Sequence, residues 1–191
     1  MQPIHIQRVN FSMTTSALSI RYSRPLIAIH WLTLLLLVAI YASMELRGYA
    51  TRGSALREGM KHWHFMLGLT VLTLVWIRLA TRWFGTTPAA DLRLPRWQRQ
   101  LAGSVHVLLY VFMVAMPILG WLLLSAEGKS IPFFGLELPP LMGTNRAWAE
   151  RFEDWHKTLA NIGYFLIGAH AGAALLHHYV FKDATLRRML P

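Results

Sequence analysis

The stretch HKTLANIGYFLIGAHAGAALLHHYVF, residues 156–181, decides the fold. It is long and apolar enough to cross a bilayer as a helix. His156 and His170 are fourteen residues apart, so on a helix both imidazoles project from about the same face, roughly 21 Å apart along the axis. Imidazoles inside a membrane are costly and usually functional. Two of them on one stripe, near opposite sides of a membrane, suit two stacked haems. The small residues Gly163 and Gly168 leave room for flat macrocycles or for close helix approach.

The composition is that of a membrane protein. Hydrophobic residues make up 54% of the 191 residues and charged residues 15%, whereas roughly a quarter of a soluble domain is charged. The net charge is +10, but the basic residues lie between long apolar runs, which argues against nucleic-acid binding. The absence of cysteine excludes disulfides, Cys-ligated zinc, iron–sulfur clusters and covalent haem attachment. Nine histidines are therefore the main supply of ligands.

These patterns predict an all-α fold, an integral membrane four-helix bundle with a short interfacial helix before the last span. The predicted spans are about 25–44, 62–83, 104–125 and 156–181. Trp148, Phe152 and Trp155 recur at helical spacing and predict the interfacial helix. We expect residues 1–22 to be a loosely ordered extension and residues 23–191 to form one domain.

The basic residues predict the orientation. Four spans place both termini on one side of the membrane, and that side holds 11 of the 19 Lys and Arg residues. The positive-inside rule therefore favours termini in the cytoplasm. The opposite orientation is the alternative, because the bias is modest.

This topology pairs four histidines by depth. His64 and His156 both lie near the outer ends of their spans, so together they suit an outer haem. His30 lies roughly 8 Å into the first span from its inner end, which matches the depth of His170 and suits an inner haem. Both haems would be six-coordinate, which favours electron transfer over oxygen binding at iron.

Other histidines allow alternatives. His106 also lies at the inner depth and could replace His30, which we prefer because it is deeper in a cleaner apolar run. His177 is seven residues after His170, on nearly the same face, and suits a haem propionate contact, a quinone hydrogen bond or a proton relay. His106 is a second candidate for quinone or proton handling. No role is assigned to His5, His62 and His178.

A cluster of basic residues is expected on the outer side. Its members are Arg47, Arg52, Arg57 and Lys61. They could draw in an anionic substrate by electrostatic steering. Contact with lipid head groups is the simpler explanation for the same residues.

Several motifs resemble the bacterial cytochrome b561 family, over nearly everything from Tyr22 to Pro191. The matching stretches are Tyr22-Ser-Arg, Ile29-His30-Trp31, Met44-Glu45-Leu46-Arg47-Gly48, His64-Phe-Met-Leu-Gly68, His106-Val-Leu-Leu-Tyr110, Pro117-Ile-Leu-Gly120, Trp155-His156-Lys-Thr-Leu-Ala-Asn-Ile-Gly163-Tyr, His170-Ala and His177-His178-Tyr179. Any one piece is weak, but the combination is specific.

The resemblance implies a four-helix bacterial inner-membrane protein with two b-type haems that delivers electrons to quinone. It implies ligand pairs joining helix one with four and helix two with four, in agreement with the depth argument. The member type it looks like most is the superoxide oxidase, an oxidoreductase that oxidises superoxide on the periplasmic side and reduces ubiquinone. The outer basic cluster gains weight from this, because superoxide is an anion.

Two other functions remain open from the sequence. The protein could be a haem-containing subunit that docks a partner redox enzyme or a periplasmic protein, although its short loops mildly favour a stand-alone enzyme. It could instead be a haem-free, histidine-lined metal or proton transporter, although the spans lack the Asp or Glu residues that would accompany such histidines.

Overall fold

Four long helices make up most of the fold and confirm the all-α membrane bundle. The computed structural model describes residues 21–85, 88 and 95–191, so nearly all of the expected N-terminal extension lies outside the described residues. The helices are α1 (Arg24–Arg47), α2 (Ala55–Phe84), α3 (Arg96–Ala126) and α4 (Arg146–Tyr179). Each is long and apolar enough to cross a membrane.

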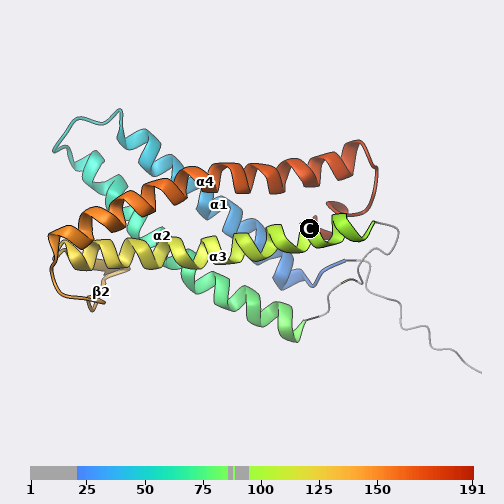
Figure 1. Ribbon diagram of the computed structural model, residues 1–191, viewed down its shortest axis with the longest axis horizontal. Coiled ribbons are helices and arrows are strands. Elements are labelled where there is room, and N and C mark those ends of the chain that lie inside the picture. The colour runs from blue at the N-terminus through green and yellow to red at the C-terminus, as the bar shows by residue number, and fades with distance from the viewer. Residues whose placement is uncertain (1–20, 86–87, 89–94) are drawn as a thin grey trace, which may run out of the picture.

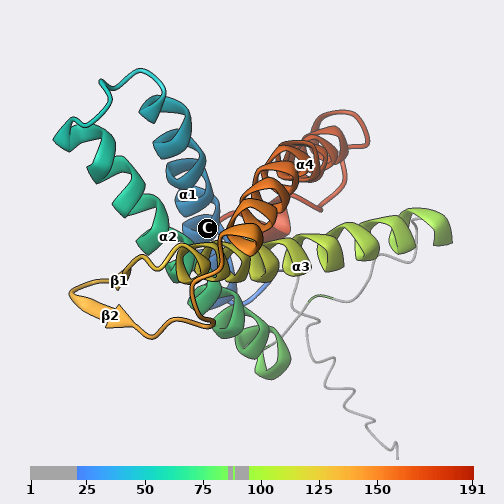
Figure 2. The ribbon, with the colours of Figure 1, turned by 60° about the vertical axis from the view of Figure 1, so that its left-hand side comes forward.

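The helices are arranged as two antiparallel pairs. Helix α1 packs on α2, and α3 packs on α4, while a smaller contact between α2 and α3 joins the pairs. Figure 1 shows the α1–α2 pair crossing the α3–α4 pair at an angle, and Figure 2 shows the helices diverging from this crossing. The connections 48–54 and 127–145 share one end of the bundle, which we call the loop end (Figure 1). The opposite end, where α1 begins and α4 ends, we call the terminal end.

Local signals in the sequence set where the helices begin. The side chain of Ser54 accepts a hydrogen bond from the backbone N–H of Arg57 over 3.2 Å and caps α2. Pro25 occupies the first turn of α1, and Pro95 directly precedes α3, positions where proline removes no helical hydrogen bond. All four helices therefore begin before the apolar spans predicted from composition, whereas α4 ends two residues before the predicted end of its span.

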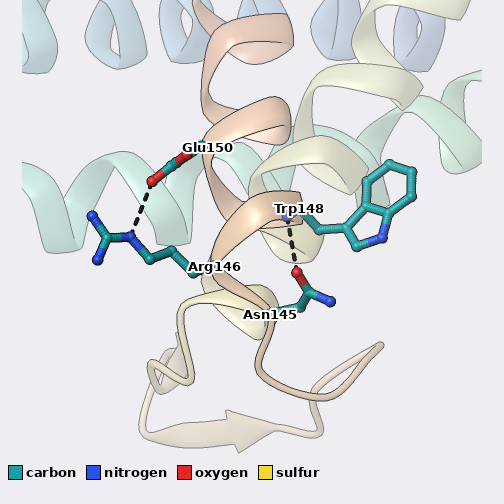
Figure 3. A network of polar contacts seen from close by, with 4 residues as sticks. All are labelled: Asn145, Arg146, Trp148 and Glu150. Atoms are coloured by element: carbon teal, nitrogen blue, oxygen red, sulfur yellow. Dashed lines mark hydrogen bonds and ion pairs between the residues drawn. The ribbon is translucent and has the colours of Figure 1, made fainter.

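The expected short interfacial helix is the beginning of α4. Asn145 accepts a hydrogen bond from the backbone N–H of Trp148 over 3.1 Å, and Arg146 pairs with Glu150 over 3.1 Å one turn later (Figure 3). No glycine or proline follows before His156, so nothing interrupts the helix between its interfacial turns and its span. The interfacial segment and the last span thus form one continuous helix.

A β-hairpin, which the sequence analysis did not predict, closes the loop end. Strands β1 (Ile131–Phe133) and β2 (Leu136–Leu138) pair antiparallel. Phe134 and Gly135 make the tight turn with φ of 47° and 85°. Ile131 is buried against Leu69 of α2 and Leu124 of α3, which fixes the hairpin to the bundle.

The C-terminal tail folds back onto the start of α1. A short 3₁₀ helix, η1 (Arg187–Met189), follows α4. The indole N–H of Trp31 donates to the carbonyl oxygen of Met189 over 2.7 Å, and the N–H of Tyr22 donates to that of Arg188 over 3.3 Å. The two ends of the described chain therefore lie together at the terminal end.

Candidate functional site

Two histidines face each other between α2 and α4 at the loop end. The ring centroids of His64 and His156 are 6.1 Å apart, with the ring planes at 68°. The Nδ1 atom of His64 lies 3.3 Å from the carbonyl oxygen of Ile40 on α1. When Nδ1 donates its hydrogen to that carbonyl, the second ring nitrogen is left free for a metal.

A second pair faces across α1 and α4 toward the terminal end. The ring centroids of His30 and His170 are 6.2 Å apart, with the planes at 74°. His106 of α3 lies closer to His170, with 5.2 Å between the centroids. Its Nδ1 atom lies 2.6 Å from the carbonyl oxygen of Ala102, one turn earlier in its own helix.

The two longer separations fit axial ligation of one metal ion. An imidazole nitrogen binds a metal at about 2 Å, so two rings on opposite sides of one ion have centroids about 6 Å apart. Both His64–His156 and His30–His170 match this spacing, whereas His106 and His170 are too close together. The Nδ1 atoms of His30 and His156 are also buried without a hydrogen-bond partner among the described residues. This donor set fits two haem irons, each with two imidazole ligands.

The loop-end pair lines a large cavity. The cavity has a volume of 520 Å³, within the roughly 300–1,000 Å³ of small-molecule sites. Gly68 and Gly120 contribute to its wall, and a Cβ at Gly120 would already lie 3.5 Å from the ring of His156. The glycine in α3 therefore keeps space next to this imidazole. We call this space the loop-end cavity.

The cavity at the second pair is much smaller. It measures 60 Å³ and is lined by His30, His106 and His170 together with side chains from all four helices. The spacing of His30 and His170 fits a haem, but a macrocycle enters this space only after lining side chains, His106 among them, move aside. We call it the terminal-end cavity.

An aromatic layer separates the two pairs. Gly163 lies midway in sequence between His156 and His170, and a side chain there would overlap both Tyr41 and Phe112. The Tyr41 hydroxyl donates to the carbonyl oxygen of Ala160 over 2.9 Å, which ties α1 to α4 at this level. The glycine thus lets two aromatic side chains pack directly on the backbone of α4.

The four predicted steering residues are not equivalent. Arg47 and Lys61 line the loop-end cavity. Arg57 instead donates to the carbonyl oxygens of Arg47 and Ala50 over 2.7 and 3.1 Å, so it holds the end of α1. Arg52 is exposed in the connecting loop and does not line the cavity.

Sequence reasoning missed two other cations of the loop-end cavity. Lys129 and Lys157 both line it, paired with Glu127 over 2.8 Å and Glu153 over 2.6 Å. Lys157 directly follows His156, and this adjacency is the signal that could have found it. Lys129 is placed by the turn before the hairpin, which has no comparable signal.

His177 lies outside the terminal-end cavity, at the start of the C-terminal tail. Its Nδ1 atom is 2.5 Å from a carboxylate oxygen of Asp183, and the N–H of Thr185 donates to the other oxygen over 2.8 Å. Burial alone would raise the pKa of Asp183, but these hydrogen bonds outweigh it and hold the pKa below its ordinary value. His62 and His178 line neither cavity.

The fold and the facing imidazoles are those of a class of protein, the membrane helical bundles whose histidines on neighbouring helices can hold a metal cofactor. The chain belongs to the prokaryotic cytochrome b561 family, whose model matches residues 21–191. The resemblance seen in the sequence motifs is thereby confirmed. The protein is a multi-pass membrane electron-transfer protein, and its family implies b-type haem.

Curated relatives match over almost their whole length. "Cytochrome b561 homolog 1" of Escherichia coli is 42% identical over 171 residues, which cover 90% of this chain and 97% of the relative. "Probable superoxide oxidase CybB" of Yersinia pestis is 40% identical over 174 residues, which cover 90% of this chain and 96% of the relative. "Cytochrome b562" of Cereibacter sphaeroides is 30% identical over 179 residues, covering 88% and 94%.

Proposed function

We propose that this protein is a superoxide:ubiquinone oxidoreductase that carries electrons through two b-type haems. His64 and His156 hold one haem, and His30 and His170 hold the other. The observation that carries the proposal is that α4 offers two imidazoles on one face, each about 6 Å from an imidazole of a different helix. Each haem would supply a one-electron couple, and ligation by two imidazoles would favour electron transfer over oxygen binding.

The loop end is where superoxide gives up its electron. Arg47, Lys61, Lys129 and Lys157 line the loop-end cavity together with Glu45, Glu127 and Glu153. An anion therefore meets a small net positive charge on approach, supplied by Arg47 and Lys61, which form no ion pair in the described residues. Such a field raises the association rate of an anion and weakens with ionic strength. The relative named as a probable superoxide oxidase supports this choice of donor.

The terminal end is where ubiquinone is reduced, in the cytoplasmic half of the inner membrane. Two superoxide ions each lose one electron and leave as O₂, while one ubiquinone takes up the two electrons and two protons to become ubiquinol. The excess of Lys and Arg in the segments that the sequence assigns to the side of the termini supports a cytoplasmic location for both termini. His106 and His177 are candidates for binding quinone or for moving its protons. His177 has the carboxylate of Asp183 beside it as a proton partner.

The test is spectroscopic and then kinetic. A reduced-minus-oxidised spectrum with a pyridine haemochrome assay on the detergent-purified protein should give two b-type haems per chain. Superoxide generated under anaerobic mixing should then reduce them, and added ubiquinone should reoxidise them with two superoxide consumed per ubiquinol formed. Protein that contains both haems but is not reduced by superoxide, and that purifies with a stoichiometric redox partner, would replace the superoxide assignment with a docking subunit. Protein without haem would overturn the proposal.

A further inference from the structure

The terminal-end cavity contains an arginine that the electron-transfer scheme does not use. Arg78 belongs to the membrane-spanning part of α2 and lines this cavity beside His30, His106 and His170. The other lining residues are Thr33, Leu34, Leu37, Leu109, Tyr110, Met113 and Ile167, and none of them is acidic. The cavity therefore carries a fixed positive charge that its own wall does not neutralise.

The guanidinium of Arg78 is incompletely bonded. Its Nε atom is buried and has no hydrogen-bond partner among the described residues. Tyr110 is a close neighbour, because its ring centroid is 5.6 Å from the guanidinium carbon and its side chain also hydrogen-bonds with Arg78. Both contacts stabilise the cation, but they leave its Nε–H without an acceptor among the described residues.

Arg57 shows what a structural arginine looks like in the same helix. It gives one nitrogen to two backbone carbonyls at the end of α1, and both contacts are within hydrogen-bond distance. Arg78 has no such partner for its Nε atom, although it is placed where an unpaired cation is most costly. Charged side chains inside a membrane pair with something or line a functional path. The missing hydrogen-bond acceptor for the Nε–H of Arg78 is therefore to be sought in a ligand bound in the cavity.

We propose that Arg78 is the anion-binding residue of the terminal-end cavity and that it takes the carboxylate of a haem propionate. This inference rests on the proposed function, because the haem is the one held by His30 and His170. The planar fork of a guanidinium matches two oxygens of a carboxylate or of a phosphate. A lipid phosphate offers the same chemistry, but a carboxylate attached to the macrocycle arrives together with the imidazole ligands. The loop-end cavity differs, because its cations have Glu45, Glu127 and Glu153 among them.

The test compares Arg78→Gln and Arg78→Lys with a matched control, Arg82→Gln. Arg82 lies one turn further along α2, is exposed and does not line the cavity, so its loss removes the same charge without removing the contact. Haem release to an excess of apomyoglobin is followed in the purified proteins, with His30→Ala marking the spectrum that remains when the terminal-end haem is lost. Arg78→Gln should release that haem about tenfold faster or more, because the truncation of one partner in a buried charged pair mainly raises the dissociation rate. Arg78→Lys should be intermediate and Arg82→Gln should match the wild type.

A second arm identifies the bound group. Wild-type protein from haem-deficient cells is loaded with haem or with its dimethyl ester, which lacks free carboxylates. The ester should leave the wild type at least as fast as haem leaves Arg78→Gln, and esterification should accelerate release less in Arg78→Gln than in the wild type. A purely structural arginine would give the same acceleration in both proteins.

Phospholipid content separates the remaining outcomes. If Arg78→Gln releases haem at the wild-type rate but loses an anionic phospholipid that the wild type and Arg82→Gln retain, the residue binds an anion whose source is the lipid. If neither haem release nor bound lipid changes, the anion-binding role is overturned. A wild type that binds no haem would overturn the proposed function, and the lipid comparison would still decide whether Arg78 binds an anion.

Discussion

The hydroxyl of Tyr41 packs against the backbone of α4 at Gly163 and donates a hydrogen bond to the carbonyl oxygen of Ala160 over 2.9 Å. A side chain at Gly163 would overlap this hydroxyl and the ring of Phe112. The contact lies between the two histidine pairs, so it sets the distance between α1 and α4 for both.

Gly163→Ala should destabilise the protein by about 1–3 kcal/mol, because an added methyl group in a packed interior forces its neighbours to move. Thermal unfolding in detergent, followed together with haem content, measures the effect. Gly168→Ala is the matched control, since a Cβ there meets nothing within 4 Å. Equal stability of the two variants would show that α1 and α4 can separate at this level without loss.

His30→Ala should remove one of two haems, and His106→Ala should keep both. The ring centroid of His30 is 6.2 Å from that of His170, which is about the separation expected for two imidazoles bound to one metal ion. The centroid of His106 is only 5.2 Å from that of His170, which is too close. Pyridine haemochrome stoichiometry on the two purified variants checks this. The reverse result would make His106 the ligand and leave His30 as a neighbour.

Lys61→Gln should lower the second-order rate of reduction by superoxide several-fold at low ionic strength, because Lys61 lines the loop-end cavity. Arg52→Gln should change the rate much less, since Arg52 carries the same charge outside the cavity wall. Pulse radiolysis at a series of salt concentrations measures both rates. Equal rates for the two variants at low salt would remove the steering role of the cavity.

Arg57→Ala should lower stability and leave superoxide steering largely intact. Hydrogen bonds from a charged group contribute about 1.5–3 kcal/mol, and Arg57 gives two to the end of α1. Unfolding in detergent measures the loss, and the superoxide rate of the folded fraction serves as the control. A variant of wild-type stability that reacts much more slowly would return Arg57 to the steering group.

Asp183→Asn should loosen the C-terminal tail at neutral pH. The pKa of Asp183 lies below its ordinary value in the folded protein, so its ionised form stabilises the tail above the ordinary carboxyl range, and this contribution is lost as the pH falls through the folded pKa. Hydrogen exchange at the amide of Thr185, which donates to Asp183, reports the loosening. The ratio of variant to wild-type exchange rates should be high at pH 7 and approach one as the carboxyl group becomes protonated. A ratio that does not depend on pH would exclude this role of the charge.

The four spans and the depth of the histidines could be predicted because both follow from local regularities. Apolar length identifies a span, and a rise of about 1.5 Å per residue places each histidine along it. The choice between His30 and His106 could not be made in the same way. Both lie at a similar depth, and the difference between 6.2 and 5.2 Å from His170 arises from how the helices are rotated and packed.

The elements that were not predicted depend on contacts across the chain. The β-hairpin has strands of three residues, too short for an alternating pattern, and it is fixed by burial of Ile131 against α2 and α3. The role of Arg57 depends on where α1 ends relative to α2. The turns before His156 were predicted as a separate short helix. In the structure they are the first turns of α4, and the lack of a glycine or proline before His156 explains why the helix is not interrupted.

The arrangement in two helix pairs has a consequence for how the protein matures in the cell. One pair supplies His30 and His64, and the other supplies both of their partners from α4. Besides the α2–α3 interface, the hydrogen bond of Tyr41 to Ala160 and the burial of Ile131 against α2 join the halves, and under the proposed function each haem would add a further link between them. Chains made when haem is scarce would lack these two links, so the proposed function implies that membrane proteases cleave them faster than haem-loaded chains.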